Sequence, residues 1–190
     1  MGYIFVARHG ETTSNESDIN AGPLDDPLNK KGRKEIAYLA KALSKTKITA
    51  VYSSPVFRAL ETAKILARPH HLAVKTLEDL TEAKFKAKFV GKKGRKHILT
   101  SPEAFDETYQ ELQERVVRGF NSIQKGSGNA IAVSHGDPIA ALLNYVIERD
   151  IAGKNYYVLH PDPGSLSIIE AGDTPKLVLF NFHRRLFDNY

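Results

Sequence analysis

The chain contains no cysteine, so it can form no disulfide bond and can use neither a catalytic thiolate nor a cysteine-based zinc or iron–sulfur site. It also lacks any apolar run near the roughly 20 residues that a membrane-spanning helix needs. Residues 1–7 are too short and too soon followed by charge to act as a secretory signal. From these absences we expect a cytoplasmic protein that does not bind membranes.

The 190 residues are 42% hydrophobic and 26% charged, a balance typical of one globular domain that can bury a core. We therefore predict a single domain over residues 1–190. The net charge of +5 fits a nucleic-acid binder, an enzyme that handles small acidic molecules, or an ordinary basic surface. Composition alone leaves these alternatives, and the oligomeric state, open.

Hydrophobic periodicity predicts strands that alternate with helices. Strands are expected at 3–7, 49–53, 73–76, 130–134, 165–170 and 176–182, and helices at 30–44, 55–68, 103–124 and 137–147. Ser54 and Pro55 would begin the second helix with a capping hydroxyl and a proline at the first helical position. In the helix at 103–124, charged residues such as Glu107 and Arg118 lie off the apolar face.

The early strands are continuously apolar, which is typical of parallel strands that are covered on both faces. We therefore predict an α/β fold, a three-layer α/β/α sandwich with a mainly parallel central sheet. The close spacing of the last two strands favours an antiparallel hairpin, and so antiparallel pairing, at one edge. Residues 83–100 show no period and are expected to form a short, flexible, basic insertion.

Chemically active side chains follow several of these strands. Arg8 and His9 come directly after the first strand, and His135 closes the strand at 130–134. Arg58 opens the helix that follows the second strand, and Glu82 follows the third. Because ligands bind at the carboxyl ends of strands in open α/β sheets, these groups are expected to converge on one site.

A histidine can act as a covalent nucleophile, and arginines bind phosphate oxygens through planar, bidentate hydrogen bonds. Two arginines and a second histidine would supply the positive charge that Mg²⁺ supplies in kinases, so we expect no metal and no cofactor. A metal site at His9, His135 and Asp137 is disfavoured because Arg8 adjoins His9. Serine nucleophiles are disfavoured because the chain has no Gly-x-Ser-x-Gly elbow.

Three sequence boxes, in order, resemble those of the histidine phosphatase superfamily, also called the phosphoglycerate-mutase-like family. They are 8–15 (Arg-His-Gly-Glu-Thr-Thr-Ser-Asn), 53–63 (Ser-Ser-Pro-Val-Phe-Arg-Ala-Leu-Glu-Thr-Ala) and 134–136 (Ser-His-Gly), with Leu28 and Gly32 fitting a weaker element. The resemblance spans essentially the whole chain. It implies an enzyme that acts on a small anionic phosphorylated substrate.

The resemblance also implies roles for individual residues. His9 would be the nucleophile that becomes phosphohistidine, while Arg8, Arg58 and His135 would form the phosphate pocket and Asn15 would add an amide donor. Glu82 would give a proton to the leaving oxygen, with Glu11 as a competitor near the nucleophile. Gly136 is a further phosphate-binding candidate, and the remaining substrate-binding candidates are Thr12, Gly22, Lys92 and Lys93.

Residues 84–96 are rich in lysine and contain no acidic residue, and Phe85 and Phe89 lie among the basic side chains. Three interpretations compete. The segment could be a solvated flap, which is usual for runs of like charge, or a basic lid that concentrates anionic substrates. Nucleic-acid binding through stacked phenylalanines is the least favoured of the three.

Between Glu82 and His135 the chain is shorter than in the family's mutases and has no paired arginines that would grip a substrate carboxylate. We therefore favour a phosphatase. Phosphoglycerate mutase-type phosphoryl transfer is the alternative, because Lys92 and Lys93 could hold a carboxylate. A non-catalytic module that binds a phosphorylated ligand is the alternative from another class, although such a module would have little need for both histidines.

Overall fold

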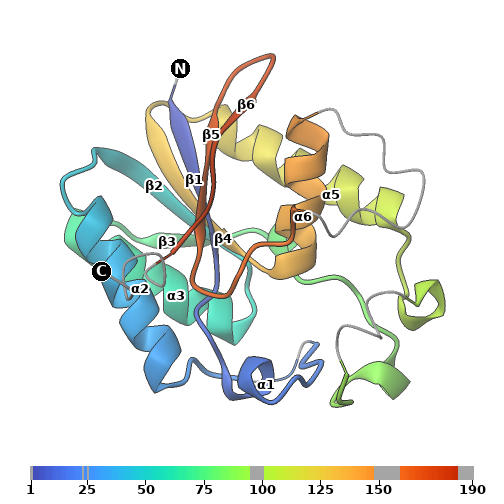
Figure 1. Ribbon diagram of the computed structural model, residues 1–190. Coiled ribbons are helices and arrows are strands. Elements are labelled where there is room, and N and C mark those ends of the chain that lie inside the picture. Colours follow the sequence, from blue (N-terminus) through green and yellow to red (C-terminus); the bar gives the residue numbers. More distant parts are fainter. Residues whose placement is uncertain (1, 23, 25, 95–100, 148–158, 184–190) are drawn as a thin grey trace.

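A six-stranded mixed sheet forms the centre of the computed structural model, which describes residues 2–22, 24, 26–94, 101–147 and 159–183 (Figure 1). The strand order is β3-β2-β4-β1-β5-β6. The strands are β1 (Tyr3–Arg8), β2 (Ile48–Ser53), β3 (Val74–Thr76), β4 (Asn129–Ser134), β5 (Leu166–Glu170) and β6 (Lys176–Phe182). Strands β1 to β4 pair in parallel, and β5 and β6 add an antiparallel hairpin beside β1. The predicted α/β fold is confirmed, with two antiparallel strands at the edge.

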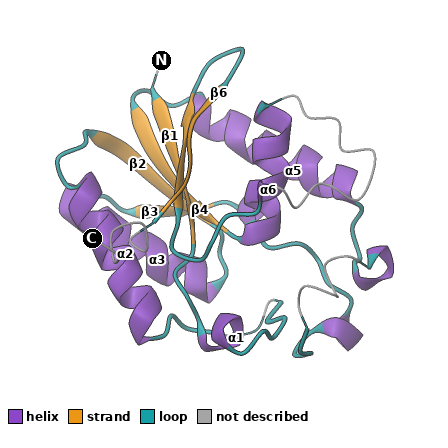
Figure 2. Ribbon diagram, viewed as in Figure 1, coloured by secondary structure: helices purple, strands orange, loops and turns teal. Residues whose placement is uncertain are grey.

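Helices cover both faces of this sheet (Figure 2). They are α1 (Thr13–Glu16), α2 (Lys30–Leu43), α3 (Phe57–Ala67), α5 (Tyr109–Gln124) and α6 (Gly136–Val146), with 3₁₀ turns η1 (Arg68–His70), η2 (Glu78–Leu80), η3 (Ala87–Phe89) and η4 (Pro102–Ala104). Alternate residues of β1 enter opposite cores: Ile4 and Val6 pack with α5 and α6, while Phe5 and Ala7 pack with α2 and α3. Burial on both faces explains why β1 is apolar without alternation.

Two predicted helices begin later than expected. Helix α3 begins at Phe57, with Val56 in the capping position instead of Ser54. The Ser54 hydroxyl accepts the Val56 N–H at 3.2 Å, and it also lies 2.8 Å from Nε2 of His135. Helix α5 begins at Tyr109 because Thr108 and Glu111 form a reciprocal capping box. The separate turn η4 occupies the start of the expected 103–124 helix.

The described part of the basic insertion is fastened to the rest of the molecule. The Phe85 ring is buried and packs on Phe105 with ring centroids 4.7 Å apart, so it is unavailable to stack on a nucleotide base. Backbone hydrogen bonds join Asn20 to Gly91 and Lys92, next to α1. The lysine side chains at 84, 88, 92 and 93 are exposed, and residues 95–100 of the expected insertion lie outside the described residues.

Candidate active site

Strands β1 and β4 deliver the two histidines to one place. Arg8 pairs with Ser134 at the ends of these parallel strands, so the next residues, His9 and His135, emerge side by side. Their ring centroids are 5.2 Å apart, with the planes inclined at 62°. Both side chains are buried. The register of the sheet thus creates a two-histidine site.

The hydrogen bonds of His9 define its tautomer. Nδ1 lies 2.9 Å from the carbonyl oxygen of Gly10, and because a carbonyl can only accept, Nδ1 carries the proton. Nε2 accepts a hydrogen bond of 3.2 Å from Nε of Arg58. The lone pair of Nε2 is therefore directed to the side of the ring where Arg58 lies. This is the tautomer that a nucleophilic Nε2 requires.

Arg58, in the first turn of α3, is buried and held by the segment that follows α1. Its Nη2 donates to the carbonyl oxygen of Gly22 at 2.9 Å. Gly22 has a φ of +53° and packs closely on Val90. The structure thus brings Gly22, predicted as a substrate-binding residue, to the site through a backbone carbonyl that fixes an arginine.

Arg8 is held on the opposite side by a turn that precedes β5. Its Nη1 donates to the carbonyl oxygen of Pro161 at 2.6 Å and lies 3.5 Å from Nδ1 of His160. His160 Nε2 lies 3.3 Å from a carboxylate oxygen of Asp137. A Cβ atom added at Gly136 would overlap the His160 ring and approach Cζ of Arg8 to 3.3 Å, so glycine is needed for this close packing.

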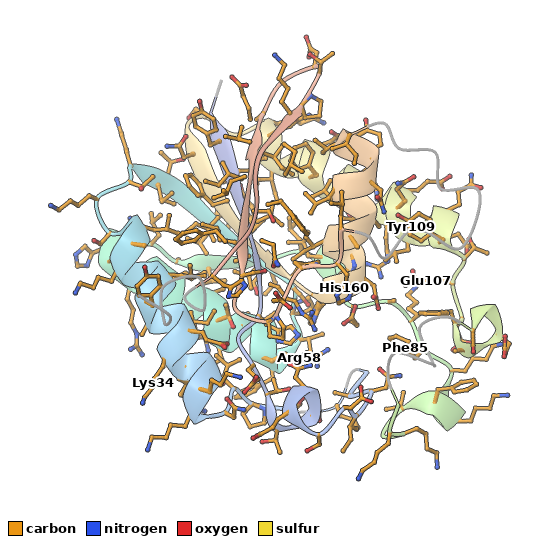
Figure 3. All side chains as sticks on the ribbon, in the orientation of Figure 1. Lys34, Arg58, Phe85, Glu107, Tyr109 and His160 are labelled. Carbon is orange, nitrogen blue, oxygen red and sulfur yellow. The ribbon has the colours of Figure 1, made fainter. Side chains whose placement is uncertain are left out.

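His160 is a site residue that sequence reasoning missed, because the sequence favours a local or solvent-facing role. His160, labelled in Figure 3, reaches Arg8 although 152 positions separate the two along the chain. A topological signal existed. Since β5 runs antiparallel to β1, with Leu166 beside Ala7, residues just before β5 must lie where β1 ends.

Ser54 is a second such residue. Its hydroxyl lies 2.8 Å from Nε2 of His135, and its backbone N–H donates to Val133 at 2.9 Å. The serine therefore orients the second histidine.

The structure separates the two candidate proton donors. Glu82 is buried, and Ser134 donates to the carbonyl of Leu80 at 2.7 Å, which ties the Glu82 segment to the residue before His135. Glu11, in contrast, forms an ion pair with Lys31 and accepts from Asn29 at the start of α2. The Glu82 carboxyl group itself accepts the Ala83 N–H at 3.1 Å, whereas that of Glu11 binds two side chains at the start of α2.

The other candidates lie around this centre. The Oδ1 atom of Asn15 accepts the Thr12 N–H at 3.3 Å in the capping box of α1, so the Asn15 amide nitrogen is the group that can donate to a ligand. Lys92 and Lys93 are exposed, on the strand-like stretch that pairs with Ile19 and Asn20. Among the residues that the structure describes, no three His, Asp or Glu side chains gather as metal ligands would.

Comparison with known proteins now adds to this geometry. Residues 4–183 match the model of the histidine phosphatase superfamily, branch 1. The chain belongs to this family. It is 29% identical over 181 residues (90% of this chain and 88% of the relative) to the 2,3-bisphosphoglycerate-dependent phosphoglycerate mutase of Thermoplasma acidophilum. It is 26% identical over 211 residues (97% and 87%) to the metal-independent phosphoserine phosphatase of Arabidopsis thaliana.

The fold of this member of the histidine phosphatase superfamily is also found in solved structures. It superposes with a TM-score of 0.83 and 22% identity on Entamoeba histolytica phosphoserine phosphatase in complex with 3-phosphoglyceric acid, covering 98% of this chain and 100% of that one. No helix in the described ranges is both long and apolar enough to cross a membrane.

Proposed function

We propose that this protein is a phosphatase that hydrolyses a small phosphomonoester through a phosphohistidine intermediate on His9. The observation that carries the proposal is the His9 tautomer: Nδ1 is fixed on Gly10, and Nε2 is directed toward Arg58. The ring of His135 lies beside that of His9, with centroids 5.2 Å apart, so both imidazoles can face one phosphoryl group. A buried nucleophile between cationic donors suits transfer of a charged phosphoryl group.

In the first step, Nε2 of His9 attacks phosphorus and the bond from phosphorus to the ester oxygen breaks. Arg8, Arg58, His135 and the Asn15 amide bind the phosphoryl oxygens, and the N-terminus of α6 at Gly136 adds the positive end of a helix dipole. Glu82, as a carboxylic acid, gives its proton to the leaving oxygen.

In the second step, the Glu82 carboxylate takes a proton from water as the water oxygen attacks the phosphohistidine. The phosphorus–nitrogen bond breaks, inorganic phosphate leaves, and His9 regains its lone pair. Throughout, the carbonyl of Gly10 accepts a hydrogen bond from the Nδ1 N–H group and stabilises the positive charge that builds on the ring.

The alternative of a mutase is supported by the similarity to the Thermoplasma enzyme. A mutase returns the phosphoryl group to a bound phosphoglycerate, which needs a grip on the substrate carboxylate; the exposed Lys92 and Lys93 are the side chains available on the basic insertion. A single assay separates the two activities: interconversion of phosphoglycerates is measured against release of phosphate from 3-phosphoglycerate and phosphoserine. We expect phosphate release to dominate.

The nucleophile is tested by rapid quenching with a ³²P-labelled monoester. We expect an acid-labile, base-stable phosphoryl group that is lost in His9→Ala and retained in the control His71→Asn, which changes an exposed histidine already in the left-handed conformation that asparagine tolerates. Turnover that survives in His9→Ala would refute the assignment. Absence of a covalent species, with ligand binding intact, would favour the non-catalytic module.

A further inference from the structure

A buried ion pair lies at the start of α5, beside the segment that carries Glu82. Arg115 binds Glu107 through two parallel hydrogen bonds, Nε to Oε2 at 2.9 Å and Nη2 to Oε1 at 2.8 Å. The two side chains are 9% and 6% exposed. Removing two charges from water is costly, so an ion pair this deeply buried is a poor device for stability alone.

The remaining donors of Arg115 hold the main chain before and at the proposed acid. Nη1 donates to the carbonyl oxygens of Asp79 and Thr81 at 3.1 and 2.8 Å, and Nη2 donates to that of Glu82 at 3.0 Å. One planar guanidinium therefore fixes three carbonyls within four consecutive residues.

Glu107 holds the chain on the other side of the acid. Its Oε1 accepts the backbone N–H of Lys84 at 2.7 Å, so the ion pair binds the main chain both before and after Glu82. Glu107 and Phe85 lie close together in Figure 3. The phenylalanine anchors the following turn in the core against Phe105.

We propose that Arg115 and Glu107 are positioning residues for Glu82, fixing the main chain so that the carboxyl group meets the leaving oxygen of the substrate. The proposal rests on the proposed function, in which Glu82 is the acid. Neither residue contacts substrate; both act through the backbone of 79–84. A displacement of about 1 Å in a catalytic group can lower a rate about 100-fold.

The test uses the leaving group as its readout. A general acid accelerates departure of an alkoxide, typically by about 10²- to 10⁴-fold, but is hardly needed for p-nitrophenolate, a good leaving group. We measure kcat/KM, which reports the step that phosphorylates His9, for an alkyl phosphate and for p-nitrophenyl phosphate. Changes in phosphate binding and in the fraction of folded enzyme affect both substrates equally and cancel in the ratio of the two values. The ratio therefore reports the contribution of the general acid.

Three variants are compared with Glu82→Gln. In Arg115→Lys, a point charge replaces the planar fork, and we expect kcat/KM to fall about 10- to 100-fold for the alkyl ester and less than about 3-fold for the aryl ester. Glu107→Gln should show the same selectivity, and it tests the same role if Arg115→Lys does not fold. Arg118→Lys is the control: Arg118 lies on the same helix and binds Asp79 at 2.7 Å, but its side chain is 66% exposed.

Each outcome decides the proposal. A selective loss in Glu82→Gln, Arg115→Lys and Glu107→Gln, but not in Arg118→Lys, supports it. Selective loss in Glu82→Gln with equal losses for both esters in the ion-pair variants overturns the positioning role and leaves the proposed function intact. If Glu82→Gln itself shows no selectivity, the acid assignment and the inference both fail. The proposed nucleophile is then tested separately, by trapping the phosphoryl group on His9.

Discussion

Replacement of Gly32 by alanine probes how α2 meets the nucleophile loop. Gly32 lies in the first turn of α2, where its N–H donates to the side chain of Asn29 at 2.8 Å. A Cβ atom there would overlap the carbonyl oxygen of Glu11 and lie 2.6 Å from the Glu11 nitrogen. These are backbone atoms that cannot rotate away. A Cβ atom added at Gly10 would likewise lie 2.8 Å from the Gly32 carbonyl oxygen.

Two effects of opposite sign compete in Gly32→Ala. Alanine is favoured over glycine in a helix by up to about 1 kcal/mol. Overpacking against fixed groups costs about 1–3 kcal/mol, and movement of the loop would also disturb the bonds from Glu11 to Asn29 and Lys31. We expect the clash to exceed the propensity gain, with a net loss of about 2 kcal/mol and a fall in Tm of about 4–8 °C.

Thermal unfolding of matched variants checks both the sign and the size. Lys34 is exposed on the same helix (Figure 3), so Lys34→Gly compared with Lys34→Ala measures the propensity term alone. Gly32→Ala should lower Tm, as Lys34→Gly does. It should also lower kcat, because a displaced Glu11 would shift the preceding carbonyl of Gly10, which accepts the hydrogen bond of Nδ1 of His9. A rise in Tm in Gly32→Ala would refute the backbone contact on which the reasoning depends.

Three further predictions concern other contacts. Ser54→Ala removes the bond of 2.8 Å to His135, so kcat/KM should fall about 2- to 10-fold; Tm should also fall by a few degrees, because the buried hydroxyl accepts the Val56 N–H as well. An unchanged rate would contradict the orienting role. His160→Asn keeps an acceptor for Arg8, so the inhibition constant for inorganic phosphate should stay within about 3-fold of that of the unchanged protein. His160→Ala removes the acceptor and should raise that constant about 5- to 10-fold. Equal effects of the two variants would argue against a bond to Arg8. Phe85→Ala should lower the free energy of unfolding by about 3 kcal/mol, measured by urea denaturation, because the ring is buried; a loss below about 1 kcal/mol would place the ring outside the core.

Strand-end reasoning predicted the centre of the site because topology leaves it little freedom. The strands that carry His9 and His135 are adjacent and parallel, and their register aligns the residues before each histidine. Once a sequence indicates a parallel sheet, its carboxyl-terminal edge is fixed, and polar residues that follow the strands must gather there.

The residues that sequence reasoning missed reach the site by other routes. The amphipathic pattern places Glu107 on the polar side of a helix at 103–124, where it would be solvated. Because the capping box starts α5 at Tyr109, Glu107 lies before the helix and turns inward to Arg115. A buried ion pair between charged residues cannot be told from two solvated charges by their spacing alone.

The division of the site between strand ends and connecting segments bears on the choice between phosphatase and mutase. The groups proposed to hold the phosphoryl group, Arg8, His9 and His135, lie at or just beyond the ends of β1 and β4, which fix them rigidly. The proposed leaving-group side is built from connections: residues 18–22 contact residues 90–94, and residues 79–84 are held by Arg115 and Glu107. The identities to a mutase and to a phosphatase, 29% and 26%, are similar and do not discriminate between the activities. The discrimination must come from the connections, since only they can supply or withhold a grip on the rest of the substrate.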